Sequence, residues 1–375
     1  MSKYRFDQIA INSTEKKKPV EEDRFTYLGL EHLDSGSLKV TRYGSEVAPI
    51  GEKLIMRKGD VLFGKRRAYQ KKVAIAPFDG IFSAHGMVLR PKEDVIDKDF
   101  FPLFISSDYF LDAAIKISVG SLSPTINWRD LKELEFELPD LDTQRRLAAV
   151  LWAMNETMDS YKELIAATDE LVKSQFMEQF NGHKRDRLGN YIEQVRGVSY
   201  KPKDLGSELD DQHITLLRAN NVNGGKINFD EVQFVDKGKI SDVQVVRDGD
   251  ILMCASSGSL EHVGKAALCR LAGEYTFGAF CKIIRATGRL RPEYIVSYMT
   301  GHEYRHIIME LAQGSNINNL RNEHINDLMI PVPSDDEQKE FISFIEQSDK
   351  SKFEMEQALS ELTATYKRII TENLG

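Results

Sequence analysis

Two long stretches of the chain carry apolar residues at heptad spacing. The first, residues 142–182, begins with a possible N-cap, Asp142, and contains neither proline nor glycine before Gly182. Its apolar positions form three rows: Leu147, Met154 and Tyr161; Val150, Leu164 and Leu171; and Leu151, Met158, Ile165 and Val172. A stripe that persists over about five heptads is typical of a coiled coil.

The second stretch, residues 336–375, repeats this pattern less regularly. Its rows are Phe341, Met355, Leu362 and Ile369, beside Ile345, Leu359 and Tyr366. Ser348 and Lys352 interrupt the stripe. We expect two spacer helices that pair with each other. The alternative is that each helix packs only on its own globular neighbour.

The remaining segments, residues 1–141 and 183–335, alternate short apolar runs with Gly, Asp and Pro. This pattern predicts mixed α/β (α+β) domains. Expected strands include 60–63, 73–76 and 87–89, and expected helices include 101–117 and 291–311.

The two globular segments and their helices form an internal repeat. Residues match at a constant offset of 194 in the pairs Leu131 and Ile325, Leu134 and Leu328, Pro139 and Pro333, and Gln144 and Gln338. Two Gly-Asp turns, at Gly59 and Gly249, also correspond. The chain order is therefore domain, helix, domain, helix. If the helices pair, they run antiparallel, and an approximate two-fold axis relates the copies.

The acidic and basic residues are unevenly distributed along the chain, and this affects which partners the chain can bind. The chain carries a formal charge of −8, yet residues 1–140 hold 22 basic and 22 acidic side chains, and residues 183–334 hold 19 of each. The excess of acid lies in the two helical stretches, so the globular parts have room for basic faces. The three cysteines form no C-x-x-C pair, and no apolar run is long enough for a membrane span or signal peptide. We expect a cytoplasmic protein with no membrane partner.

Two short motifs resemble catalytic signatures. Gly59 to Arg66 falls one residue short of a P-loop, because Arg66 replaces the hydroxyl that binds magnesium. His302, Glu303 and His306 form an H-E-x-x-H pattern on an expected helix, which leaves a zinc metallopeptidase as an alternative function. The other interpretation is an ordinary amphipathic helix, because the first copy has no such residues. We find no methyltransferase or nuclease motif and expect no catalysis, cofactor or metal in this chain.

Several clusters are candidates for DNA contact, since Arg reads guanine, Asn reads adenine, and cations bind phosphate. The first copy has a basic cluster on an expected hairpin arm: Lys65, Arg66, Arg67, Tyr69, Lys71 and Lys72. At the matching place the second copy has Ser256, Ser257, Ser259 and Lys265. Further candidates are Asn220, Asn221, Asn223, Asn318, Asn319 and Arg321. For each residue alone, a solvated hairpin or an ordinary turn is the alternative explanation.

These features together resemble the specificity subunit of type I restriction–modification enzymes. The resemblance rests on 188–192, on the twin Gly-Asp turns, and on the closing segments 131–144 and 325–338. It implies two target-recognition domains that each read half of a bipartite double-stranded DNA site, with the helices as a spacer. It also implies two modification subunits that methylate adenine with S-adenosylmethionine, and restriction subunits that use ATP and Mg²⁺. A scaffold that binds only proteins remains a further alternative.

Overall fold

The computed structural model describes residues 1–271, 273–313 and 319–374. Its internal contacts divide the chain into two compact units. Unit 1 comprises Met1–Lys162 and Gln357–Gly375, and unit 2 comprises Glu163–Glu356. The division passes through both long helices, so each unit contains one part of each helix.

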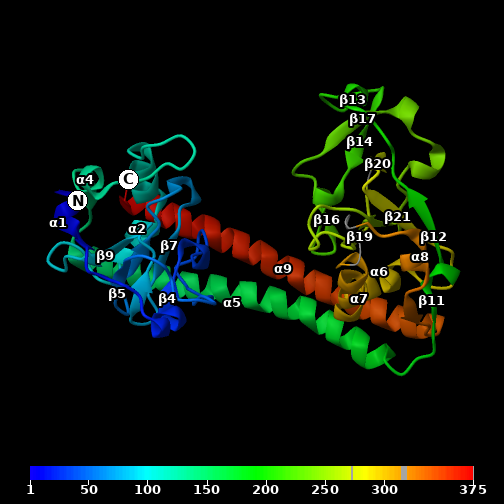
Figure 1. Cartoon of the computed structure of the whole chain (residues 1–375), viewed down its shortest axis with the longest axis horizontal. Coiled ribbons are helices and arrows are strands. Elements are labelled where there is room, and N and C mark those ends of the chain that lie inside the picture. The colour runs from blue at the N-terminus through cyan, green and yellow to red at the C-terminus, as the bar shows by residue number, and fades with distance from the viewer. Residues whose placement is uncertain (272, 314–318, 375) are drawn as a thin grey trace. The chain divides into compact units, whose positions relative to one another are not determined.

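Unit 1 is a mixed α/β structure (Figure 1). Its strands are β1 (Ser2–Arg5), β2 (Ala10–Ser13), β3 (Lys16–Lys17), β4 (Tyr27–Leu28), β5 (Lys53–Met56), β6 (Val61–Phe63), β7 (Val73–Ile75), β8 (Gly80–Phe82), β9 (Met87–Pro91) and β10 (Glu135–Leu138). Its helices are α1 (Phe6–Ile9), α2 (Phe101–Ser106), α3 (Asp108–Lys116), α4 (Trp128–Leu131) and the first part of α5 (Leu141–Phe180).

Unit 2 has the same mixed composition. Its strands are β11 (Arg185–Arg187), β12 (Ile192–Arg196), β13 (Leu205–Gly206), β14 (His213–Leu217), β15 (Val222–Asn223), β16 (Lys226–Ile227), β17 (Gln233–Asp236), β18 (Ile251–Cys254), β19 (Ala266–Leu268), β20 (Tyr275–Phe277), β21 (Cys281–Ala286) and β22 (Met329–Pro331). Its helices are α6 (Pro292–Thr300), α7 (His302–Gln313), α8 (Asn322–Asn326) and the first part of α9 (Asp335–Leu374).

One four-stranded sheet is the same in both units and confirms the internal repeat. Its strand order is β2-β9-β6-β7 in unit 1 and β12-β21-β18-β19 in unit 2, antiparallel throughout. The register also matches, because Val61 pairs with Leu89 where Ile251 pairs with Ile284. A two-stranded ribbon, β1-β10 or β11-β22, leads from this sheet to the long helix.

The second sheet of each unit differs. Its order is β3-β5-β8-β4 in unit 1 and β13-β17-β14-β20 in unit 2. In both, one parallel pair is kept: β4 with β8, and β14 with β20. β8 is an inner strand, however, whereas β20 lies at the edge. The copies have therefore diverged in the second sheet.

Buried polar contacts explain why the repeated residues recur. Arg90 donates two hydrogen bonds to Asp60, of 2.7 and 3.0 Å, and Arg285 donates two to Asp250, of 2.8 and 2.7 Å. These pairs tie the inner strands β6 and β9, or β18 and β21, together. Gln144 and Gln338 are also buried, and each accepts a 2.8 Å bond from a backbone N–H, of Asp97 and of Arg291 respectively. A buried charge or polar group needs such a partner, so these residues belong to the framework.

The expected strands are confirmed, but each of the two expected helices is broken in two. Residues 101–117 form α2 and α3, because Ser107 adopts an extended backbone and caps α3 by accepting the N–H of Phe110. Residues 291–311 form α6 and α7, with the break at the extended Gly301. Apolar periodicity continues across each break, so the pattern alone does not reveal it.

The long helices begin with side-chain caps. The first N–H groups of a helix have no partner within it, so a preceding acceptor stabilises them. For α5 this acceptor is Asp140, which binds the N–H of Thr143 at 2.9 Å, rather than the expected Asp142. For α9, Ser334 and Glu337 form a reciprocal capping box.

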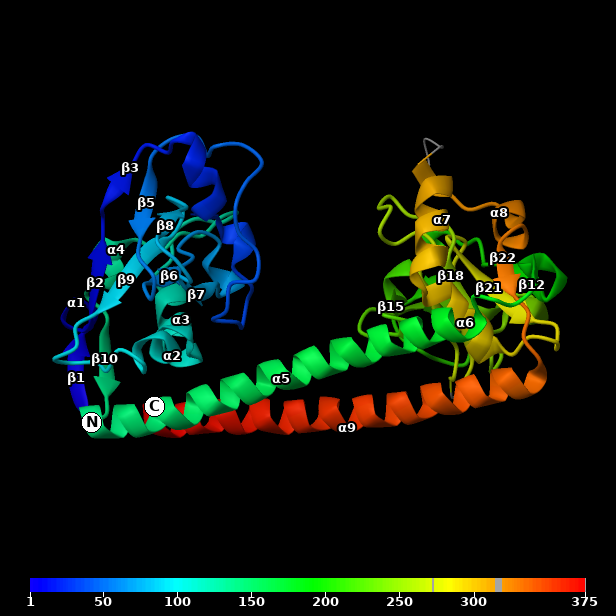
Figure 2. The same cartoon turned by 90° about the horizontal axis from the view of Figure 1, so that it is seen from below.

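Within each unit, parts of α5 and α9 pair antiparallel (Figure 2). In unit 1, Asn155 contacts Tyr366, and Met158 contacts Thr363. In unit 2, Asp169 pairs with Lys352 at 2.5 Å, and the rings of Phe176 and Phe341 lie 5.6 Å apart. Within each unit, residue numbers in successive contacts rise along α5 and fall along α9, as antiparallel pairing requires. Lys352, which interrupts the apolar pattern, is 8% exposed because Asp169 pairs with it.

One of the three apolar rows of α5 does not face a partner. Leu151 and Met158 are buried, but Val150, Leu164 and Leu171 are 51%, 53% and 53% exposed. A pair of helices buries a narrow stripe on each, so three neighbouring rows are too many for one partner. The end of each long helix instead joins a domain core: Phe176 and Phe180 in unit 2, and Ile370 and Leu374 in unit 1. In the described part of the chain, no helix combines the length and apolarity of a membrane span.

Candidate nucleic-acid interface

Three loops of unit 1 are joined by backbone hydrogen bonds next to the shared sheet. We call these three loops together the junction of unit 1. The loops are 64–72 after β6, 83–86 before β9, and 119–127 before α4. The N–H of Arg66 donates to the carbonyl of His85 at 3.3 Å, and the N–H of Ile126 donates to the carbonyl of Lys65 at 2.9 Å. Backbone bonds therefore fix where the side chains of these loops stand.

Arg66 and His85 give the junction of unit 1 its polar chemistry. Arg66 is exposed, and its Nε donates to the hydroxyl of Ser123 at 3.0 Å. Its Nη1 lies 3.4 Å from Nε2 of His85. Burial, and then the charges of Arg66 and Lys65, lower the pKa of His85 below its ordinary value of 6.5. The imidazole is therefore neutral at pH 7 and has one donor and one acceptor nitrogen.

The rest of the basic cluster is divided between exposed and internally paired groups. Arg67 and Tyr69 are exposed. Lys71 instead pairs with Asp108 at 2.6 Å and with Asp112 at 2.7 Å, both on α3. Lys72 donates to the carbonyl of Leu30 at 2.6 Å, and Lys65 is half-buried, which lowers its pKa. The structure thus places Lys71 and Lys72 where they hold the loop in place.

Unit 2 has the same junction with different side chains. Its loops are 255–265 after β18, 278–280 before β21, and the described residues 319–321 before α8. The N–H of Ser256 donates to the carbonyl of Phe280 at 3.0 Å, and the N–H of Leu320 donates to the carbonyl of Ala255 at 2.8 Å. Ser256 also forms a bridge with Asn319, as Arg66 does with Thr125. Ser256 and Phe280 therefore stand where unit 1 has Arg66 and His85.

A cleft of about 600 Å³ opens beside the junction of unit 2. It brings together three of the expected residues, Asn220, Ser256 and Ser257. Three further residues line it that the sequence pattern did not predict: Tyr200, Arg218 and Phe280. The Nε atom of Arg218 is buried and has no hydrogen-bond partner in the described part of the chain. The cleft thus combines hydrogen-bonding side chains with two aromatic rings.

The other candidates of unit 2 lie apart from this cleft or are engaged within the unit. Asn221 is buried, and its amide bonds to the backbone of Arg218, Asn228 and Glu231. Asn223, Ser259 and Arg321 are exposed but do not line the cleft, and Nζ of Lys265 lies 3.4 Å from His262. Asn318 lies outside the described residues.

Helix α7, which carries the H-E-x-x-H pattern, holds the 255–265 loop. Arg305 donates to the carbonyls of Leu260 at 2.9 Å, Glu261 at 2.7 Å and Val263, and buried Tyr304 donates to that of Gly264 at 2.9 Å. These bonds fix a loop that includes Ser256 and Ser257.

The three residues of the zinc pattern have separate partners. His302 pairs with Glu170 at 2.8 Å, His306 pairs with Glu310 at 3.2 Å, and Arg185 donates to both oxygens of Glu303, at 2.5 and 2.9 Å. No group of three potential metal ligands occurs among the described residues. Nothing in this geometry favours the metallopeptidase.

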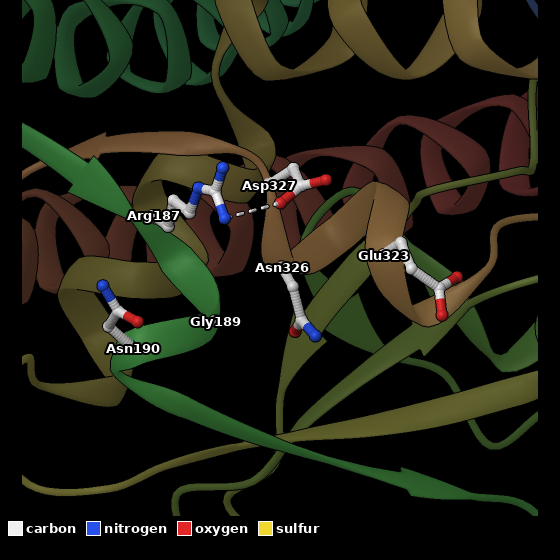
Figure 3. A pocket seen from close by; sticks show the side chains of 6 residues that line it. All are labelled: Arg187, Gly189, Asn190, Glu323, Asn326 and Asp327. Atoms are coloured by element: carbon white, nitrogen blue, oxygen red, sulfur yellow. Dashed lines mark ion pairs between the residues drawn. The ribbon is translucent and has the colours of Figure 1, made fainter.

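A smaller polar recess of about 270 Å³ lies between the 188–190 turn and α8 (Figure 3). Arg187 points toward Asp327, with 3.7 Å between their charged atoms. Gly189 packs closely there, because an added Cβ would lie 2.7 Å from Cβ of Asn326. The segment 188–191, Leu-Gly-Asn-Tyr, therefore lets α8 pack closely against the turn.

A family model matches the chain over both units. The model for the type I restriction modification DNA specificity domain matches residues 14–167 and 212–363. This chain belongs to that family. Each match covers one junction and three strands of its shared sheet, β6, β7 and β9 in unit 1 and β18, β19 and β21 in unit 2. The DNA specificity domain therefore occurs twice here.

Individual specificity subunits show the extent of the similarity. The chain is 36% identical over 167 residues to the StySPI specificity subunit of Salmonella potsdam, which is 44% of this chain and 36% of that protein. It is also 36% identical over 145 residues to the EcoKI specificity subunit of Escherichia coli K12, which is 39% of this chain and 31% of that protein. The chain thus spans about a third of the length of these relatives.

Solved structures support the fold of the whole chain. The S subunit from M. genitalium matches with a TM-score of 0.55 at 13% identity, covering 100% of this chain and 96% of that one. A chain from a structural study of type I R-M system assembly matches with a TM-score of 0.57 at 18% identity, covering 99% and 97%. At these identities the likeness concerns the fold.

Proposed function

We propose that this chain is the DNA-reading specificity subunit of a type I restriction–modification complex, and that each unit reads one half of a bipartite site. One observation carries the proposal. The two junctions share their backbone hydrogen bonds, whereas their side chains differ: Arg66 and His85 in unit 1, Ser256 and Phe280 in unit 2. A common framework with different exposed chemistry is what two readers of different half-sites require.

The side chains at each junction suit contact with DNA. In unit 1, Arg66 is the candidate for bidentate contact with guanine, and exposed Arg67 and Tyr69 are candidates for phosphate contact. In unit 2, Asn220 is the candidate for adenine, and Arg218, Ser256 and Ser257 supply further hydrogen bonds. Lys71, Lys72 and Asn221 hold the loops that carry these groups.

The chemistry of modification and cleavage belongs to partners in this proposal. Two methyltransferase subunits bind S-adenosylmethionine, and restriction subunits use ATP and Mg²⁺, while this chain contributes no catalytic residue. The acidic long helices suit protein docking: residues 141–182 hold 7 acidic and 4 basic side chains, and residues 335–375 hold 10 and 5. Such a charge disfavours contact with phosphates. The complex acts in the cytoplasm, where its DNA is.

The paired helices set the unread gap between the half-sites in this proposal. Each helix is 40 residues long, and a helix advances about 1.5 Å per residue. Removing one turn from α5 and the paired turn from α9 is expected to change the gap and leave both half-site sequences unchanged. An unchanged gap would remove the spacer role.

The test of the proposal is selection of duplexes from a random DNA pool by the chain co-purified with its methyltransferase subunit. The expected result is a split consensus with a fixed gap. A folded complex that enriches no sequence would favour the alternative of a scaffold that binds only proteins.

A further inference from the structure

Phe280 and His85 occupy the same place in the two junctions. The carbonyl of His85 accepts the N–H of Arg66 at 3.3 Å, and the carbonyl of Phe280 accepts the N–H of Ser256 at 3.0 Å. Each residue comes just before the inner strand, β9 or β21, of its shared sheet. The side chains differ completely in chemistry, because one is a neutral imidazole and the other is a phenyl ring.

The exposure of Phe280 has no explanation in the packing of unit 2. Its side chain is 70% exposed, whereas its neighbours Phe277 and Cys281 are 0% and 1% exposed. The backbone is held firmly, because the Phe280 carbonyl accepts the N–H groups of both Ala255, at 2.9 Å, and Ser256, at 3.0 Å. An exposed phenyl ring on a fixed backbone loses little conformational entropy on binding, so it is suited to contact with a partner.

The surroundings of Phe280 indicate the chemistry of that partner. The ring lines the cleft with Arg218, Asn220 and Ser256, whose side chains are those that bond to base edges. The major groove presents a single apolar group beside those edges, the 5-methyl group of thymine, and Phe is one of the side chains that contact it. The minor groove has no methyl group.

We propose that Phe280 is a specificity-determining residue that contacts a thymine methyl group in the half-site bound by unit 2. This inference rests on the proposed function and deepens it. His85 gives unit 1 a polar group at the equivalent position, so the two half-sites differ there in base preference.

The position of the ring favours methyl contact over insertion between base pairs. Wedges that unstack DNA project beyond their surface into the minor groove. Phe280 instead lines a concave cleft beside polar side chains, and its carbonyl is tied to the loop after β18. A concave cleft of this kind can contact the edge of a base pair without unstacking it.

The experiment replaces each thymine of the selected unit 2 half-site by uracil, one at a time, and measures the affinity of the chain in complex with its methyltransferase subunits. Uracil lacks only the methyl group. We expect one position to lose affinity about three- to fivefold, the value for burial of one methyl group. The Phe280→Ala complex should bind the thymine duplex more weakly and show no difference between thymine and uracil there.

The matched control is His85→Ala at the equivalent position of unit 1. This complex should keep the thymine–uracil difference in the half-site of unit 2. Because Phe280 is exposed, its replacement should leave the thermal unfolding of the complex unchanged, which separates lost contact from lost folding.

Two results would overturn the inference: no thymine shows a penalty, or the thymine–uracil penalty persists in Phe280→Ala. If the penalty persists and Phe280→Ala weakens both duplexes equally, 2-aminopurine fluorescence that shows an unstacked base in the wild-type complex would identify a wedge. Failure of the proposed function is distinguishable, because the wild-type complex would then select no split consensus.

Discussion

The two units keep one framework and differ in what they attach to it. Both contain the same four-stranded antiparallel sheet, the same buried Asp–Arg pair and the same backbone bonds at the junction. Their second sheets and their exposed junction side chains differ. Positions that carry the fold are thus separate from the exposed junction positions, so one set can change without disturbing the other.

The loops after β6 and β18 are held by equivalent helices, through side chains of opposite charge. In unit 1, Asp108 and Asp112 on α3 bind Lys71 of the loop. In unit 2, Arg305 on α7 binds carbonyl groups of the loop. The requirement shared by the units is a fixed loop, and each meets it with its own residues.

The largest expected effect is on the framework. Asp250→Ala leaves the mostly buried Arg285 without its carboxylate partner, because the side chains of Asp250 and Arg285 are 2% and 14% exposed. We expect a loss of about 3–5 kcal/mol of stability in unit 2, measured by chemical denaturation. Hydrogen exchange should show the loss in β18 and β21 and little change in β6 and β9.

The control is Asp248→Ala, because the side chain of Asp248 is 70% exposed in its pair with Arg270. Its expected cost is below about 1 kcal/mol. Equal costs for the two variants would contradict a framework role for Asp250.

A smaller effect is expected at the loop of unit 2. Arg305→Met keeps the length of the side chain and removes its bonds to three carbonyls. Arg305 is only partly buried and holds a single loop, so its loss should cost less than the loss of the Asp250 pair. Amide exchange in 256–264 should accelerate about tenfold, which corresponds to the loss of one hydrogen bond of about 1.5 kcal/mol. Lys71→Met is the matched variant and should affect 64–72 instead. Unchanged exchange in either loop would show that another contact holds it.

The helix pair offers a comparison between an ion pair and a neutral pair. Asp169 and Lys352 of unit 2 stand where the repeat places Thr363 and Met158 of unit 1. Asp169→Thr alone leaves Lys352 unpaired and should cost about 1–2 kcal/mol, less than a fully buried pair because Asp169 is 50% exposed.

Adding Lys352→Met should restore most of that stability, measured by thermal unfolding in a double-mutant cycle. A double variant no more stable than Asp169→Thr would show that the charge of Lys352 is not the reason for the loss.

The smallest effect concerns pH at the start of α9. Hydrogen bonds from the hydroxyl and N–H of Ser334, and from His183, lower the pKa of Glu337 from 4.5 to about 2. The folded state therefore binds fewer protons than the unfolded state, and the stabilisation is present above pH 4.5 and declines as the pH falls toward 2. The difference in Tm between the wild type and Glu337→Gln should shrink over this range. A difference that stays constant would contradict the shift.

The sequence predicted the elements and the repeat because both leave periodic patterns. The heptad rows located α5 and α9, and the constant offset paired Gln144 with Gln338. The pattern missed the helix breaks at Ser107 and Gly301 because apolar spacing continues across them. It also overestimated the apolar stripe of α5, since Val150 and its row are exposed.

The candidate site was only partly predictable. Charge density located Arg66, but it did not distinguish exposed cations from Lys71, whose partners lie on α3. Phe280 carries no signal in the sequence, because an isolated Phe reads as a core residue. The missing information was the strand register. When β21 is aligned with β9, Phe280 takes the position equivalent to His85, which identifies it as a junction residue.

Each unit is proposed to read its own half-site. The most direct measurement is selection from a random DNA pool by the wild-type complex and by one that carries Arg66→Ala with Arg67→Ala. We expect a split consensus in which the variant loses base preference in one half and keeps the other half and the gap unchanged. Loss of preference in both halves, or in neither, would contradict it.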